Sequence, residues 1–159
     1  MAVDRLVERD ARNAPCRTHE IPLGQAIDAD ALPRVAGVEA AAYPALAARY
    51  GYAANDVLAV AAGREALAEP IVEGLPDLLA EAVVAFRSEQ AGSLGDVLLR
   101  RTRLGLLAAR DVSRPAVLER IADVVGEELG WERARRAAEL DGFAREAEAE
   151  GLVVDLVAA

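Results

Sequence analysis

The feature that most limits the fold of this chain is a helical segment that is apolar nearly all round. Its sequence is LPDLLAEAVVAFRSEQ, from Leu75 to Gln90, and its apolar side chains fall on overlapping faces of a helix. Such a helix must be covered on most of its sides, because each apolar face needs a partner. The segment therefore predicts a central helix. Its one interior acid, Glu81, is a candidate for a structural ion pair.

The elements around this helix are expected to be helices too. Hydrophobic residues make up 53% of the 159 residues but aromatic residues only 4%, so the core must consist of many small side chains. Such a composition favours closely packed helices over a β-sandwich. No repeat of fixed period and no long heptad pattern is found. We therefore predict an all-α fold, an irregular bundle of about six helices.

The organisation of the sequence changes near residue 38. A short helical pattern from Val3 to Arg9 is followed by a non-periodic stretch that three prolines interrupt. A stretch of that length without regular structure is uncommon inside a compact domain. We therefore expect two parts. Residues 1–38 would be an N-terminal helix and an extended linker left over from an upstream domain, and residues 39–159 an all-helical domain.

Several residues mark helix ends and corners. Gly51 supplies the positive φ that favours a helix C-terminus, and so predicts a corner between two helices. Ser93 and Asp96 have the spacing of a capping box, and Ser113 is the expected N-cap of a later helix. Trp131 follows a helix-ending glycine and is expected to pack at the next corner.

The last helix is expected to be exposed and amphipathic. Arginine and glutamate dominate one face, and a narrow apolar stripe occupies the other. The stripe consists of Ala134, Ala137, Leu140, Ala144 and Ala147.

Three arginines lie inside an otherwise apolar segment, DVLLRRTRLGLL, from Asp96 to Leu107. On a helix Arg100 and Arg103 share a face and Arg101 points elsewhere, so at most two can converge on one target. One interpretation is an anion clamp, because arginine binds phosphate with two hydrogen bonds. The other is a set of ion pairs that hold helices together, which we favour because arginines in mostly buried helices usually meet carboxylates. The candidate carboxylates are Glu81, Glu89 and Asp96.

No pattern in the chain predicts a catalytic, cofactor-binding or metal-binding residue. Phosphate-binding glycine loops and the motifs of zinc proteases and serine hydrolases are absent from the 159 residues. One cysteine, Cys16, and one histidine, His19, are too few for an internal disulfide or a histidine-based metal site. The net charge of −9 disfavours binding to nucleic acid. The N-terminus has no apolar run long enough for a signal peptide, so we expect a cytoplasmic protein.

Several motifs follow one another in a set order. They are the LP before the helix that begins A-E, Arg87 and Glu89 near its end, the string D-V-L-x-R-R-T-R, and E-L-G-W before an arginine-rich helix. Over roughly Tyr43 to Phe143 they resemble the C-terminal helical domain of the FAD-dependent (aerobic) glycerol-3-phosphate dehydrogenases. The earlier CRT and PL resemble the chain that leaves that family's flavin-binding domain. Arg87 joins the structural ion-pair candidates on this basis.

The resemblance implies the C-terminal part of a longer flavoenzyme that oxidises glycerol 3-phosphate to dihydroxyacetone phosphate and passes electrons to a membrane quinone. FAD and substrate would be bound upstream, so this chain would hold no cofactor and would stabilise or cap its parent. The partner would be the upstream flavin-binding domain, which should cover an apolar patch. A homo-oligomer and a parent peripheral on the inner face of the cell membrane are further expectations. The alternatives are a free-standing helical protein-interaction module and, third, an anion-binding domain that uses Arg100 and Arg103.

Overall fold

The computed structural model describes Arg5, residues 18–20 and residues 24–152 of the chain. All helices and turns assigned there are consistent with the all-α prediction, which is confirmed. The one pairing of extended backbone in these residues is an isolated antiparallel bridge between Pro70 and Leu78. Apart from Arg5, the expected N-terminal helix lies outside the described residues.

The described residues form five helices of nine residues or more and three single turns of α-helix. The α-helices are α2 (Ala42–Tyr50), α3 (Ala54–Gly63), α4 (Glu65–Ala68), α5 (Leu79–Ser88), α6 (Leu104–Leu107), α7 (Ala109–Val112), α8 (Pro115–Leu129) and α9 (Arg133–Ala149). Shorter turns are η1 (Thr18–Glu20), η2 (Ala29–Ala31), η3 (Gly51–Ala53) and the π-helical η4 (Asp96–Arg101). None of the helices in this part of the chain has both the length and the apolar character needed to cross a bilayer.

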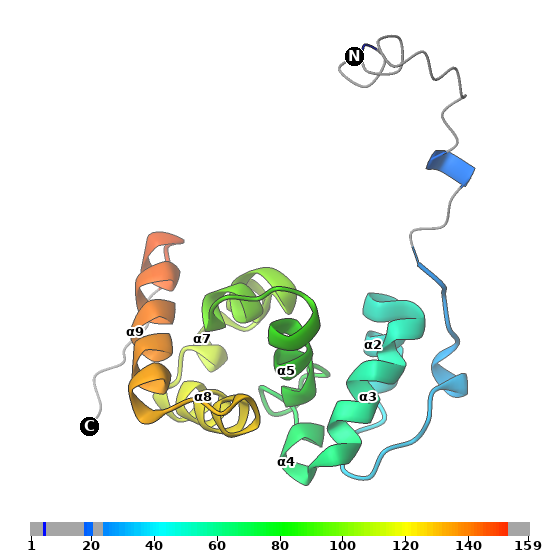
Figure 1. Cartoon of the computed structure of the whole chain (residues 1–159), viewed down its shortest axis with the longest axis horizontal. Coiled ribbons are helices and arrows are strands. Elements are labelled where there is room, and N and C mark those ends of the chain that lie inside the picture. Colours follow the sequence, from blue (N-terminus) through cyan, green and yellow to red (C-terminus); the bar gives the residue numbers. More distant parts are fainter. Residues whose placement is uncertain (1–4, 6–17, 21–23, 153–159) are drawn as a thin grey trace.

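The centre of the bundle is α5. Every residue from Leu79 to Ala85 is buried, as its apolar pattern predicts. Figure 1 shows α5 in the middle of the molecule, with α2, α3 and α4 on one side and α8 and α9 on the other. The central helix therefore joins two groups of helices into one core, which is continuous through the described residues.

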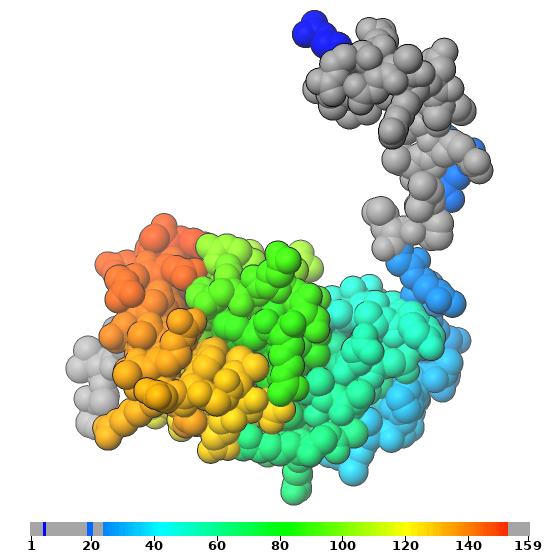
Figure 2. Space-filling model, in the orientation of Figure 1, coloured from blue at the N-terminus to red at the C-terminus, as the bar shows by residue number. Residues whose placement is uncertain are grey.

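The irregular segment before α2 packs against the bundle. Leu32 is 3% exposed and belongs to the core, and the backbone N–H of Val35 donates to the Tyr43 hydroxyl at 2.8 Å. In Figure 2 this blue segment lies along the cyan surface of α2 and α3. The division near residue 38 stays a prediction, but residues 24–38 share the core of the helical domain.

Gly51 allows this segment to pass close to the corner between α2 and α3. Its φ is +56°, and a Cβ atom at this position would lie 2.4 Å from the carbonyl oxygen of Gln25. The N–H of the next residue, Tyr52, donates to that same oxygen at 2.7 Å. A side chain at position 51 would therefore separate the corner from the segment that crosses it.

The expected N-cap of α8 is wrong. Arg114 occupies that position, and the hydroxyl of Ser113 is buried with no hydrogen-bond partner in the structure described. Half of the expected capping box does form, because the N–H of Asp96 donates to the Ser93 hydroxyl at 3.1 Å. The Asp96 carboxylate accepts instead from the N–H of Gly92 at 2.8 Å.

The apolar stripe expected on α9 is also partly wrong. The residues of α9 that are buried are Glu139, Phe143 and Ala147, whereas Ala134 and Ala137 are exposed. Glu139 points inward because its carboxylate accepts from the N–H of Leu94 at 2.8 Å. The side of α9 that faces the bundle thus begins with a buried acid.

Candidate functional site

Residues Asp96–Arg101 form one wide turn that then breaks. The N–H and the hydroxyl of Thr102 both donate to the carbonyl of Val97, five residues earlier, at 2.9 Å and 3.0 Å. Arg103 then adopts a left-handed conformation with φ of +58° before α6 begins. The expectation that Arg100 and Arg103 share one helix face is therefore wrong, because the helix ends between them.

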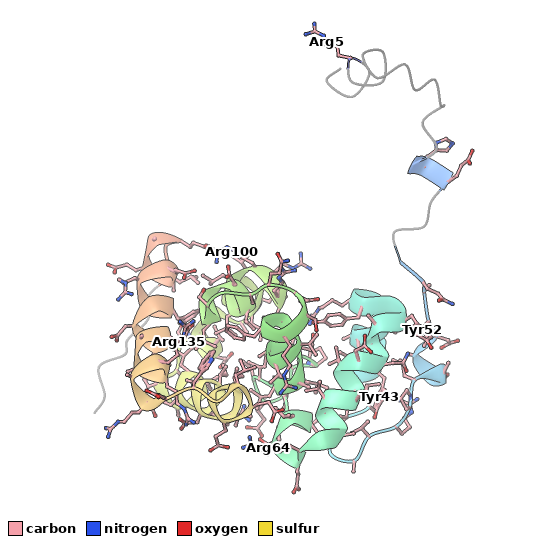
Figure 3. The ribbon with its side chains drawn as sticks, in the orientation of Figure 1. Arg5, Tyr43, Tyr52, Arg64, Arg100 and Arg135 are labelled. Carbon is pink, nitrogen blue, oxygen red and sulfur yellow. The ribbon has the colours of Figure 1, made fainter. Side chains whose placement is uncertain are left out.

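Arg100 lies among carboxylates from two elements. Its Nη1 atom lies 3.1 Å from Asp96 Oδ1 and 3.0 Å from Glu146 Oε2 in α9, and Nη2 lies 3.6 Å from Glu150 Oε1. The hydrogen bond with Glu146 is the main reason that the pKa of Arg100 is raised. Figure 3 shows Arg100 on the edge of the molecule near α9. The side chain joins η4 to α9 at the surface.

Arg101 and Arg87 each bind the C-terminal end of a helix. Arg101 Nη2 donates to the carbonyl of Glu89, the residue that caps α5, at 2.5 Å, and Nη1 lies 3.9 Å from the Glu89 carboxylate. Arg87 Nη2 donates to the carboxylate of Glu128 in the last turn of α8 at 2.7 Å and to its carbonyl at 3.3 Å. A positive charge is favourable at both places, because helix C-termini carry partial negative charge.

Arg103 is exposed and its side chain forms no hydrogen bond or ion pair with the residues that the structure describes. Arg100 already faces three carboxylates. The geometry therefore gives no support to an anion clamp formed by these two arginines.

Glu81 pairs with Arg49, so its expected pairing with the arginines of residues 96–107 is wrong. Arg49, in the last turn of α2, forms an ion pair with the Glu81 carboxylate at the start of α5. Its Nη2 atom also lies 2.6 Å from Asp77 Oδ1, although the two groups are misaligned for a hydrogen bond. The other Glu81 oxygen accepts from the N–H of Leu78 at 2.8 Å, which caps α5. The cluster of Arg49, Asp77 and Glu81 thus ties α2 to α5.

This cluster sets two carboxylates against one guanidinium inside the protein. The Asp77 and Glu81 side chains are 5% and 1% exposed. Burial is the main reason that the pKa of Glu81 is raised, and the attraction of Arg49 only partly opposes it. For Arg49, burial alone would lower the pKa, but the two carboxylates outweigh it and the pKa is raised. Burial and the nearby Glu81 charge also raise the pKa of Tyr50.

Trp131 packs at the corner between α8 and α9. Its ring meets Phe86 of α5 edge to face, with centroids 5.1 Å apart, and the Arg135 guanidinium lies 5.6 Å from the ring centroid. The backbone N–H of Trp131 donates to the carbonyl of Gly126 at 2.7 Å. These contacts fix how α8 and α9 meet over the central helix, which is a structural role.

The sequence model of the family described as the C-terminal domain of alpha-glycerophosphate oxidase matches residues 16–136, more than half of the chain. The chain belongs to this family. The resemblance found from the motifs is thereby confirmed, and the family domain includes the segment before α2 as well as α2–α8.

Relatives of this family domain carry the name glycerol-3-phosphate dehydrogenase. Glycerol-3-phosphate dehydrogenase 1 of Mycobacterium tuberculosis (strain ATCC 25618 / H37Rv) is 39% identical over 122 residues, which are 76% of this chain and 22% of the relative. Glycerol-3-phosphate dehydrogenase of Synechocystis is 35% identical over 82 residues, 52% of this chain and 14% of the relative. The chain thus spans about a fifth of the length of the first of these relatives. No solved structure matches it.

The sequence patterns did not identify several partners in these ion pairs. They are Arg49 and Asp77 beside Glu81, Glu128 beside Arg87, and Glu146 and Glu150 beside Arg100. Arg49 and Asp77 were missed because Arg49 lies far from Glu81 in the chain and only the fold brings them together. A usable signal existed for Asp77, since it stands four residues before Glu81 at the start of an apolar helix. Glu139, which pairs with Arg135, gave no signal either, because charged residues are spread along the whole of α9.

The arrangement of these residues serves to hold helices together. Each cluster bridges elements, α2 to α5, α5 to α8 and η4 to α9. In the part of the chain that the structure describes, no group of three or more metal-binding side chains comes together.

Proposed function

We propose that this chain serves as the C-terminal domain of an FAD-dependent enzyme that oxidises glycerol 3-phosphate to dihydroxyacetone phosphate. The observation that carries the proposal is the family match over residues 16–136, together with relatives several times longer that are named glycerol-3-phosphate dehydrogenases. In the proposal FAD and substrate are bound by an upstream domain of the same polypeptide. This domain stabilises or caps that part and contributes no catalytic residue.

The ion pairs support a stabilising role. Three arginines that could have bound a phosphate pair instead with carboxylates or with a helix C-terminus. They are Arg87, Arg100 and Arg101. The proposal also places the protein in the cytoplasm, with the parent peripheral on the inner face of the cell membrane and passing electrons to quinone. A free-standing interaction module is not favoured, because the matched relatives contain this domain as a small part of their length.

The decisive experiment is an immunoblot of the source cells with an antibody raised against this chain. We expect one band several times heavier than the 16.8 kDa of the chain. A band only at 16.8 kDa would overturn the proposal in favour of a free-standing module. In a second test the purified chain should be colourless and inactive with glycerol 3-phosphate, whereas the longer protein should be yellow and active. A yellow 159-residue chain would contradict the placement of FAD upstream.

A further inference from the structure

Two adjacent leucines of α6 expose most of their surface. Leu106 is 68% exposed and Leu107 is 74% exposed, whereas Leu104 in the same turn is 1% exposed. Because α6 is one turn long and begins at the left-handed Arg103, Leu104 anchors its inner side and the two leucines point outward. A single exposed leucine is ordinary, but two neighbours at the tip of one turn form an apolar projection.

Unpaired arginines flank these two leucines in the sequence. Arg103 and Arg110 are exposed and neither forms an ion pair with a residue that the structure describes, and no acid lies between them in the sequence. Their neighbours are paired, Arg100 with Glu146 and Arg114 with Asp111. The net charge of the chain is −9, so this positive apolar spot differs from the protein as a whole. We call Arg103, Leu106, Leu107 and Arg110 the α6 patch.

We propose that the α6 patch docks on the upstream domain of the same polypeptide, in an apolar hollow bordered by carboxylates. This inference rests on the proposed function. The leucines would enter the hollow and lose their contact with water, and the two arginines would meet the carboxylates at its rim.

The size of the α6 patch favours a partner in the same chain. Stable complexes between separate proteins bury about 1,200–2,000 Å², more than two leucines and two arginines present. Domains of one chain meet over as little as about 600 Å², because the covalent connection supplies an effective concentration in the millimolar range. The segment that would lead to the upstream domain is fixed to the bundle at Gln25, because the backbone N–H of Tyr52 donates to the Gln25 carbonyl at 2.7 Å.

Two other occupants are disfavoured on the same grounds. A second copy of this chain would have to form an interface between separate molecules, for which the patch is small. An anionic lipid surface would attract the two arginines but repel a chain with a net charge of −9.

The test compares hydrogen exchange of residues 103–110 in the longer protein with that in the 159-residue chain. We expect at least about tenfold slower exchange of the α6 amides in the longer protein, because docking removes their access to water. Residues 118–125 of α8, which none of the variants below changes, serve as the internal reference. In the longer protein, L106S/L107S and, separately, R103Q/R110Q should abolish most of the slowing. The matched variant R133Q/R145Q removes two exposed arginines without an ion pair among the described residues and should leave it intact.

The outcomes separate this inference from the proposed function. A heavy immunoblot band with equal exchange in both proteins would overturn the docking inference and leave the proposed function standing. A band only at 16.8 kDa would overturn both. Slowing that arises in the 159-residue chain on raising its concentration, or on adding anionic phosphatidylserine vesicles, would assign the patch to a second copy or to lipid and overturn the inference. Equal melting temperatures of the 159-residue variants would show that all of them fold.

Discussion

Arg49 and Arg100 each face more than one carboxylate, but in different surroundings. The Arg49 side chain is 30% exposed and its two acidic partners are almost fully buried. The Arg100 side chain is 51% exposed, and Asp96 and Glu146 are 35% and 34% exposed. Water can replace a lost partner at the Arg100 cluster but not at the Arg49 cluster. Loss of the arginine should therefore lower the stability of the fold much more at the Arg49 cluster than at the Arg100 cluster.

The largest effect is expected from Arg49→Gln. The substitution leaves Asp77 and Glu81 buried without a compensating charge, and should lower the free energy of unfolding by about 3 kcal/mol. Urea unfolding followed by circular dichroism measures it. The matched control is Arg114→Gln, which removes a surface pair with Asp111 and should leave the stability nearly unchanged. Equal losses in the two variants would show that burial is not what separates the clusters.

A second test asks whether the burial of a carboxylate or its place in the bundle determines how much stability it contributes. Glu139 lies on α9, close to the exposed Arg100 cluster, yet is 6% exposed and accepts from the N–H of Leu94. Glu139→Ala should lower the free energy of unfolding by about 2 kcal/mol, because that buried N–H loses its acceptor. Glu148→Ala, on the exposed side of the same helix, is the control and should change little. If the two variants lose the same stability in urea, the inward-facing carboxylate has no special role.

The stability that depends on the buried cluster should change with pH. Glu81 has a pKa raised above its ordinary value of 4.5, so the folded state holds the proton more tightly than the unfolded state. Its contribution to stability is therefore fully present below about pH 4.5 and is lost as the pH rises through the folded-state pKa. Relative to Glu81→Gln, the unsubstituted protein should be more stable at pH 4.5 than at pH 7, as urea unfolding at both values would show. A constant difference would mean that burial does not raise this pKa.

The same contrast explains how much of the fold could be predicted from sequence. The burial of α5 was predicted correctly, because its pattern of apolar residues is local and repeats with the helix. The ends of α8 at Pro115 and Gly130 follow from backbone preferences that are also local. The packing of residues 24–38 on the bundle was not predicted, since three prolines and a lack of periodicity say nothing about what a segment contacts.

The sequence predicted that the arginines form ion pairs, but it did not identify most of their partners. Arg49 and Glu81 lie 32 positions apart and Arg100 and Glu146 lie 46 apart, and residue spacing identifies partners only within a few turns of one helix. The break at Arg103 was missed because a left-handed residue is usually glycine or asparagine, so arginine gave no warning. Partners and breaks that depend on the whole fold were thus beyond the sequence patterns.

The smallest effect is expected from Arg100→Gln, which completes the comparison. The carboxylates that Arg100 leaves behind are open to water, so we expect a fall in melting temperature of only about 1–2 °C. Salt provides the sharper test, because at 1 M ionic strength exposed charges interact over only about 3 Å. In 1 M sodium chloride the deficit of Arg100→Gln should largely disappear while that of Arg49→Gln persists, since water and ions reach the carboxylates around Arg100 but not the buried ones beside Arg49. If both deficits shrank together, the Arg49 cluster would be as accessible to solvent as the Arg100 cluster, and the difference between the two ends of the bundle would be one of partners rather than of burial.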